Sequence, residues 1–391
     1  MTRSTPAGIA IGLCFLAAML EGFDIASMGV AAKTMMPDLG ITDPEKIGQA
    51  FSASLLGLMF GAGLSGPSAD RLGRRPVLIA AVAVYGLFSL LTAWTRGFEL
   101  LLLVRFLTGL GLGGAMPMLI AMTSELSSHK RRTAAVGLIT AGMPLGGALV
   151  GLLARSDFAV GNWQVIFLVG GIAPLVLAAV LWLLLPETKT KSAADVLTGD
   201  ALAALFGRDR LATTAALWIA FAAVALVLHL FLNWLPSLLG DTPKAAAGIA
   251  LLFNLGGAAG GVLVGLAIDR LGVRWPLAVV FASLVAVLLA LASPGQGMTG
   301  LLAFGAGFLV MAGQFGLYGA APHYYAVGVR GTGVAAAVSA GRLGSVLGPL
   351  AAGQLLGAGA SPGQVVVATV PIVVLAGAAA MALSIWGKRA D

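Results

Sequence analysis

The sequence predicts an all-α membrane protein with twelve transmembrane helices in two six-helix halves, and three observations lead to this fold class. Of the 391 residues, 59% are hydrophobic and 10% are charged, against about 25% charged residues in an ordinary soluble domain. Apolar segments of about 20 residues, the length that spans a bilayer as a helix, recur along the whole chain. The pattern of the first half also repeats in the second. So few charged residues cannot cover the surface of the soluble cores that a chain of this length would need.

Twelve apolar segments are long enough to cross the ~30 Å hydrocarbon layer of a membrane. The first contains Glu21 and Asp24 and lacks a convincing cleavage site, so it is expected to stay in the mature protein and is not a signal peptide. The predicted spans are residues 8–32, 47–66, 76–94, 98–124, 133–154, 163–185, 211–235, 245–268, 276–292, 300–325, 332–357 and 364–386.

The positions of Lys and Arg predict the orientation. With the N-terminus in the cytoplasm, 16 of the 23 basic residues fall in cytoplasmic segments and five on the opposite side, while Arg105 and Arg342 lie inside spans. Short cytoplasmic loops collect positive charge, so both termini are expected to be cytoplasmic. The net charge of +7 is scattered through these loops. It therefore does not form the basic face that a nucleic-acid partner needs.

An internal repeat appears when the chain is shifted by 199 residues. At this single offset Asp70-Arg71-Leu72-Gly73 matches Asp269-Arg270-Leu271-Gly272, Pro37 matches Pro236, and Ala141-Gly142 matches Ala340-Gly341. One shared offset favours duplication over chance similarity. The predicted domains are residues 1–186 and 211–391, joined by a linker at 187–210 that includes a short surface helix at 194–206. Parallel repeats of this kind are typical of secondary transporters, which hold their substrate near the membrane midplane.

The loop Gly66-Pro67-Ser68-Ala69-Asp70-Arg71-Leu72-Gly73-Arg74-Arg75 resembles the signature loop between helices 2 and 3 of the major facilitator superfamily. Arg105 followed by Gly109, Gly111 and Gly113 resembles its helix-4 motif, and Gly142-Met143-Pro144-Leu145-Gly146 is similar to its helix-5 pattern. The resemblance implies the major facilitator fold and transport by alternating access.

Within that superfamily, Glu21-Gly22-Phe23-Asp24 resembles the acidic helix-1 motif of the aromatic acid:proton symporters. With Asn233-Trp234-Leu235-Pro236 and Gly341-Arg342-Leu343-Gly344, the whole chain is most similar to the 3-(3-hydroxyphenyl)propionate transporters of that family. The resemblance implies uptake of an aromatic carboxylate, such as 3-(3-hydroxyphenyl)propionate or a hydroxybenzoate, with a proton across a bacterial cytoplasmic membrane.

Four charged residues lie well inside the predicted spans: Glu21, Asp24, Arg105 and Arg342. Each charge in hydrocarbon costs at least ~2.5 kcal/mol on insertion scales, so these side chains should face a cavity and pair. Asp24 and Arg105 lie at matching depths, ~13 Å below the outer edge at 1.5 Å per residue, and Glu21 and Arg342 lie near the midplane. We therefore predict the pairs Asp24–Arg105 and Glu21–Arg342. A purely structural network is the alternative.

These charges also predict a mechanism. Glu21 and Asp24 are three residues apart and share a helix face, and they are the predicted proton carriers. With both acids ionised the four charges sum to zero, and protonation of one leaves a positive charge that a carboxylate neutralises. Proton and anion then favour each other's binding. Arg342 is the predicted carboxylate ligand, with Arg105 next.

Further polar residues are predicted to complete the substrate site by their helical spacing. His229 and Asn233 are four residues apart, as are Gln314 and Tyr318, so each pair shares one face. Asn233, Gln314 and Tyr318 are candidate substrate ligands, with interhelical hydrogen bonding as the alternative. His229 ranks below the two carboxylates as a proton carrier.

The loop motif is too close to the membrane edge to bind substrate. By resemblance, Asp70 and Arg74 latch the cytoplasmic side, with Arg71 beside them and Glu125 as an available partner. Positive-inside topology explains the same basic residues.

Other function classes are disfavoured. Gly63-Leu64-Ser65-Gly66 matches the G-x-S-G string of intramembrane proteases, but helix packing explains such small residues better. The glycines from Gly109 to Gly114 imitate a dinucleotide fingerprint without the preceding strand. Single Cys14 excludes a disulfide framework, and no P-loop or metal-ligand cluster is found, so no cofactor or metal is expected.

The remaining alternatives for the function are a symporter of a non-aromatic acid and a drug or metabolite antiporter. A monomer in the lipid bilayer is expected by analogy with the architecture.

Overall fold

The computed structural model describes residues 6–128, 131–188, 207, 210–325 and 330–386. Within these ranges the chain is helical and contains no β-strand, and twelve helices or helix pairs are long and apolar enough to cross a membrane. The predicted fold class is confirmed. The predicted surface helix at 194–206 lies outside the described residues.

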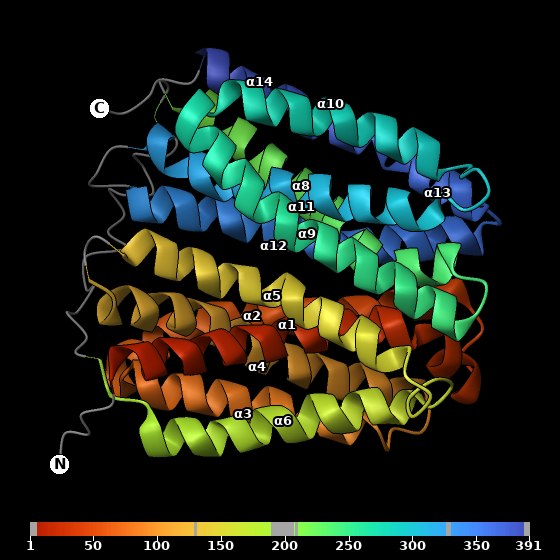
Figure 1. The fold of residues 1–391 in the computed structure, drawn as a ribbon, viewed down its shortest axis with the longest axis horizontal. Helices are drawn as coiled ribbons and strands as arrows, with labels where there is room; N and C mark the ends of the chain where they lie inside the picture. Colours follow the sequence, from red (N-terminus) through yellow and green to blue (C-terminus); the bar gives the residue numbers. More distant parts are fainter. Residues whose placement is uncertain (1–5, 129–130, 189–206, 208–209, 326–329, 387–391) are drawn as a thin grey trace. The chain divides into compact units, whose positions relative to one another are not determined.

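Six helices make up the first half, and Figure 1 shows them running side by side. They are α1 (Ala7–Asp38), α2 (Pro44–Leu72), α3 (Arg74–Thr92), α4 (Phe98–Leu126), α5 (Arg132–Ala154) and α6 (Trp163–Leu184). Each overlaps its predicted span and most extend past it, because polar residues at helix ends continue the helix into the interfacial region. The largest extension is in α2, which begins at Pro44 and ends at Leu72, beyond both ends of the predicted span.

The second half contains α8 (Leu211–Leu239), α9 (Pro243–Leu271), α10 (Arg274–Leu291), α11 (Thr299–Ala320), the 3₁₀ turn η1 (Ala321–Tyr324), α12 (Arg330–Gly357), α13 (Pro362–Ala368) and α14 (Val370–Trp386). Two predicted spans differ in detail. The last one is broken at Thr369, and the span ending at 325 finishes as a 3₁₀ turn. Pro371 and Pro322 explain both changes, because proline has no N–H to donate to the carbonyl four residues earlier.

The helices fall into two compact units. Unit 1 comprises α1 to α6 together with residues 232–251, and unit 2 comprises the other helical segments of the second half. The segment 232–251, the end of α8 and the start of α9, is thus grouped with the first half. The predicted boundaries at 186 and 211 stay a prediction.

The duplication predicted from the sequence is visible in the helix ends. Helices α2 and α9 both have 29 residues, begin at a proline and end at a leucine, 199 residues apart. Each is followed by a glycine in the left-handed region, Gly73 at φ 90° and Gly272 at φ 73°. Such φ values are strained for other residues, which explains the glycine at this turn of both copies.

The same close packing is repeated inside each unit. A Cβ atom on Gly109 of α4 would lie 1.9 Å from the carbonyl oxygen of Ser54 of α2, and one on Gly307 of α11 would lie 1.9 Å from that of Phe253 of α9. Only glycine allows backbones to approach so closely. In unit 1, α4 packs against both α2 and α3, and α1 packs against α4, α5 and α6. This arrangement places the charged positions of α1 and α4 inside the unit.

Candidate functional site

The two acids of α1 are buried inside unit 1. The side chain of Asp24 has no exposed surface, and Glu21 is 2% exposed. Close contact between α1 and α5 holds this part of α1, because a Cβ atom on Gly146 would lie 1.8 Å from the carbonyl oxygen of Met19. The acids therefore occupy the interior of the helix bundle, as functional ionisable groups in membrane proteins do.

Asp24 forms a two-point ion pair with Arg105 of α4, as the matching depths predicted. Nη2 of Arg105 donates to Oδ2 of Asp24 at 2.8 Å and Nη1 donates to Oδ1 at 3.4 Å, with both side chains fully buried. The hydroxyl of Ser89 on α3 donates to Oδ1 at 2.5 Å. Three donors from two helices thus stabilise the charge of one carboxylate.

Arg105 keeps unused binding capacity. Its guanidinium lies over the ring of Phe167 of α6, 5.6 Å from the centroid, which adds a cation–π contact. Its buried Nε has no hydrogen-bond partner among the described residues. Breaking the contacts to Asp24 would release further donors for another anion.

Tyr85 is a residue that the sequence interpretation missed. It lies on α3 one turn before Ser89 and is fully buried, and its hydroxyl has no hydrogen-bond partner among the described residues. The carboxylates of Glu21 and Asp24 are both close enough to act electrostatically on this hydroxyl. The spacing of Tyr85 and Ser89, four apart in an apolar span, was the available signal.

In unit 2 the predicted substrate ligands lie on two helices, α11 and α12, and His229, the lower-ranked proton carrier, lies on α8. Arg342 of α12 is half-buried and close enough to His229 of α8 to act on it electrostatically. Nδ1 of His229 lies 2.9 Å from the carbonyl oxygen of Ala225. On α11, Gln314 is 6% exposed and its Oε1 has no hydrogen-bond partner within the described part of the chain.

Tyr318 and Asn233 complete the predicted set. Tyr318 is 37% exposed, and its ring packs edge-on against Phe221 with 5.2 Å between centroids. Asn233 is 3% exposed and lies in the part of α8 grouped with unit 1. The pair Glu21–Arg342 joins residues of different units and stays a prediction.

Of the four residues predicted for the loop motif, Arg74 and Glu125 form an ion pair between α3 and α4. Asp70 and Arg71 are exposed and form no ion pair within the described ranges. Glu187, which follows α6, was not predicted to take part. Its Oε1 accepts from the backbone N–H groups of Arg74 and Arg75 at 3.1 and 3.3 Å, so it caps the N-terminus of α3.

Comparison with known proteins identifies the family of this chain. Residues 14–349 match the family model described as Major Facilitator Superfamily. The chain belongs to the major facilitator superfamily. It is therefore a membrane transporter and not an enzyme, as the sequence predicted.

Known relatives align with almost the whole length of this chain. A 3-(3-hydroxy-phenyl)propionate transporter of Escherichia coli is 40% identical over 381 residues, which is 96% of this chain and 93% of the relative. The 4-hydroxybenzoate transporter PcaK of Pseudomonas aeruginosa is 34% identical over 94% of this chain and 90% of the relative. A bacterial homologue of the human lysosomal transporter Spinster has a similar fold, with a TM-score of 0.77, 18% identity and 98% coverage of both chains.

The buried ion pair predicts a large stability difference. Arg105→Gln leaves the carboxylate of Asp24 buried without its cation and should lower the unfolding free energy by about 3–5 kcal/mol. The double variant Asp24→Asn/Arg105→Gln removes both charges and should recover part of the loss. Thermal unfolding of purified protein in lipid nanodiscs measures both effects.

Arg74→Gln is the matched control, because it removes an arginine from a partly exposed pair with 20% and 32% side-chain exposure. Such a pair contributes about 0–1 kcal/mol. Equal losses for Arg74→Gln and Arg105→Gln, or no recovery in the double variant, would contradict the importance of the buried pair.

Proposed function

We propose that this transporter takes up an aromatic carboxylate together with a proton, by alternating access across a bacterial cytoplasmic membrane. The names of the two relatives support the proposed substrate class, since 3-(3-hydroxy-phenyl)propionate and 4-hydroxybenzoate each combine an aromatic ring with a carboxylate. The excess of Lys and Arg in alternate loops supports cytoplasmic termini. We take the protein to function as a monomer in the bilayer.

The fully buried pair of Asp24 and Arg105 is the observation that supports proton coupling most strongly. Protonation of Asp24 removes the charge that holds the guanidinium, and Arg105 then gains a net positive charge to offer an anion. In the reverse direction, an anion bound to Arg105 weakens its hold on Asp24 and favours protonation. Each ligand thus promotes the binding of the other, which is the requirement for symport.

Glu21 and Tyr85 extend this proton site. Glu21 shares the helix face of Asp24, and the Tyr85 hydroxyl lies within electrostatic range of both carboxylates. A hydroxyl can donate to whichever carboxylate is ionised and accept from the one that is protonated. We assign Glu21 and Asp24 as proton-coupling residues and the Tyr85 hydroxyl, which bonds neither carboxylate in this structure, as a donor that either acid can engage when its charge changes.

Arg342 is the proposed first ligand of the substrate carboxylate, with Arg105 as the second. A guanidinium presents a planar fork that matches a carboxylate. Gln314 adds a buried amide whose oxygen is available as an acceptor for a phenolic hydroxyl, and Asn233 and Tyr318 are further polar candidates. The Glu21–Arg342 pairing remains part of this proposal.

The Arg74–Glu125 pair is the proposed cytoplasmic gate, with Asp70 and Arg71 beside it. It joins the cytoplasmic ends of α3 and α4, and Glu187 ties the chain after α6 to the same end of α3. A latch of this kind changes the rate of conformational exchange and leaves the substrate ligands untouched.

The carboxylate of Asp24 should be essential for coupling. Asp24→Asn keeps a side chain that bonds Ser89 but cannot carry a proton as a carboxyl group, so accumulation driven by a pH gradient should be abolished while substrate exchange is partly retained. Proteoliposomes loaded with 3-(3-hydroxyphenyl)propionate measure exchange, and the same vesicles with an imposed pH gradient measure accumulation.

Asp157→Asn is the control for this experiment, since the Asp157 side chain is fully exposed on the surface. It should accumulate substrate like the wild type. Full gradient-driven accumulation by Asp24→Asn would show that the carboxylate of Asp24 is not required for proton coupling.

Substrate affinity should depend on Arg342. Arg342→Ala removes a charge-assisted bond worth about 1.5–3 kcal/mol, so the affinity for 3-(3-hydroxyphenyl)propionate should fall by roughly 10- to 150-fold. Isothermal calorimetry on purified protein measures it, with the exposed Arg270→Ala as the control for loss of a positive charge. Unchanged affinity in Arg342→Ala would contradict this assignment and would indicate that Arg105 binds the substrate carboxylate.

A further inference from the structure

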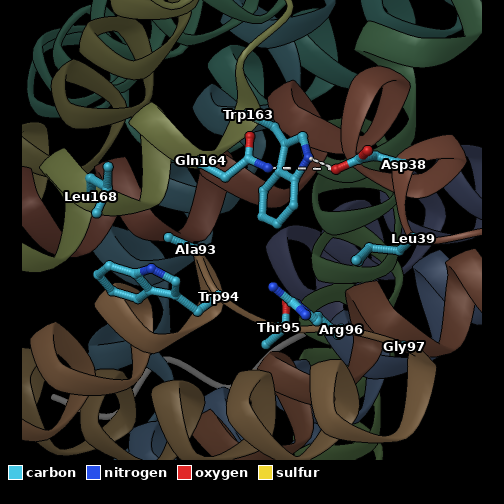
Figure 2. A pocket seen from close by; sticks show the side chains of 10 residues that line it. All are labelled: Asp38, Leu39, Ala93, Trp94, Thr95, Arg96, Gly97, Trp163, Gln164 and Leu168. Carbon is cyan, nitrogen blue, oxygen red and sulfur yellow. Dashed lines mark hydrogen bonds between the residues drawn. The ribbon is translucent and has the colours of Figure 1, made fainter.

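A cavity in unit 1 is lined by residues other than those of the buried ion pair. It has a volume of about 550 Å³, within the usual range of small-molecule pockets. Three segments meet there: the end of α1, the turn between α3 and α4, and the first turns of α6. Its lining residues, drawn in Figure 2, are Asp38, Leu39, Ala93, Trp94, Thr95, Arg96, Gly97, Trp163, Gln164 and Leu168.

Most polar groups of this pocket are already engaged. Oδ2 of Asp38 accepts from Nε1 of Trp163 at 2.9 Å and from Nε2 of Gln164 at 3.5 Å. The hydroxyl of Thr95 donates to the carbonyl oxygen of Thr92 at 2.8 Å. Arg96 is exposed and forms no ion pair with a carboxylate of the described residues. The pocket therefore offers one available guanidinium.

Aromatic rings form the apolar part of the pocket. The indole of Trp94 is 61% exposed, whereas that of Trp163 is 3% exposed and fixed by its hydrogen bond to Asp38. Figure 2 shows both indoles and the Arg96 guanidinium facing the same space. A cation beside flat aromatic walls suits a ligand that has both a carboxylate and an aromatic ring.

The pocket is linked to the buried ion pair through one turn of α6. The ring of Trp163 packs edge-on against Phe167 with 6.0 Å between centroids, and Phe167 lies under the guanidinium of Arg105. The pocket also lies at the opposite ends of α3 and α4 from the Arg74–Glu125 pair. With the proposed orientation it opens to the outside, where substrate arrives.

We propose that this pocket is an outer capture site for the aromatic carboxylate. Arg96 binds the carboxylate and the indoles of Trp94 and Trp163 hold the ring before the substrate moves to the buried site. The inference rests on the proposed function for the identity of its ligand. Asp38 sets the strength of capture, because its negative charge opposes the anion.

Three substitutions test the site through the half-saturation concentration for uptake into cells. Arg96→Gln should raise it about tenfold, equivalent to ~1.4 kcal/mol, with the maximal rate unchanged. Trp94→Leu should raise it as well, whereas a tryptophan serving only as a membrane-interface anchor would leave it unchanged. Asp38→Asn should lower it, because the amide oxygen still accepts from Trp163 while the negative charge is gone.

Lys244→Gln is the matched control, since it removes one exposed positive charge from the same predicted side outside the pocket. It should leave the half-saturation concentration unchanged. Equal effects of Lys244→Gln and Arg96→Gln would show general surface electrostatics and overturn the site. Unchanged kinetics in Arg96→Gln, or weaker uptake in Asp38→Asn, would overturn it too.

Equilibrium binding separates this inference from the proposed function. In the Arg342→Ala background, purified protein in nanodiscs should retain weak binding of 3-(3-hydroxyphenyl)propionate, measured by calorimetry, and adding Arg96→Gln should remove it. Residual binding that is independent of Arg96, or no residual binding, would overturn the capture site. Absence of gradient-driven uptake by the wild type would instead contradict the proposed function. The binding experiment would still show whether the pocket at Arg96 binds the ligand.

Discussion

A single buried ion pair constrains the first half of this transporter. Asp24 and Arg105 have no exposed surface, and each would be costly in an apolar bundle without the other. Two guanidinium contacts and the Ser89 hydroxyl compensate the carboxylate, while Nε of Arg105 has no partner among the described residues. The pair is therefore well satisfied on its acidic side and keeps spare donors on its basic side. This asymmetry suits a group that exchanges one anion for another.

The helices around the pair are arranged by a duplicated packing plan. Gly109 of α4 and Gly307 of α11 bring each helix against backbone carbonyls that are 199 residues apart, those of Ser54 in α2 and Phe253 in α9. The charges do not follow the duplication: the first half holds two acids and one arginine well inside its spans, and the second holds one arginine. Duplication thus explains the scaffold, and divergence of a few side chains explains why proton coupling is proposed for one half and carboxylate binding chiefly for the other.

The sequence was sufficient to predict the twelve spans, the repeat offset and the Asp24–Arg105 pair. These depend on hydrophobic length and on depth along a helix axis, which residue counting provides. Ser89, Tyr85 and Glu187 were missed because their roles depend on how each helix is rotated about its axis and on the path of the chain after α6. The pocket at Arg96 was missed for a related reason, since three separate segments form it. The break at Thr369 could have been predicted from Pro371.

Proton uptake on substrate binding tests the central claim most directly. Purified transporter in a weakly buffered solution with a pH indicator should take up protons when 3-(3-hydroxyphenyl)propionate at the same pH is added, because anion and proton binding are linked through Asp24 and Arg105. The account predicts a rise in pH that saturates with the binding isotherm. Saturated binding without proton uptake, at every pH at which the protein transports, would contradict it.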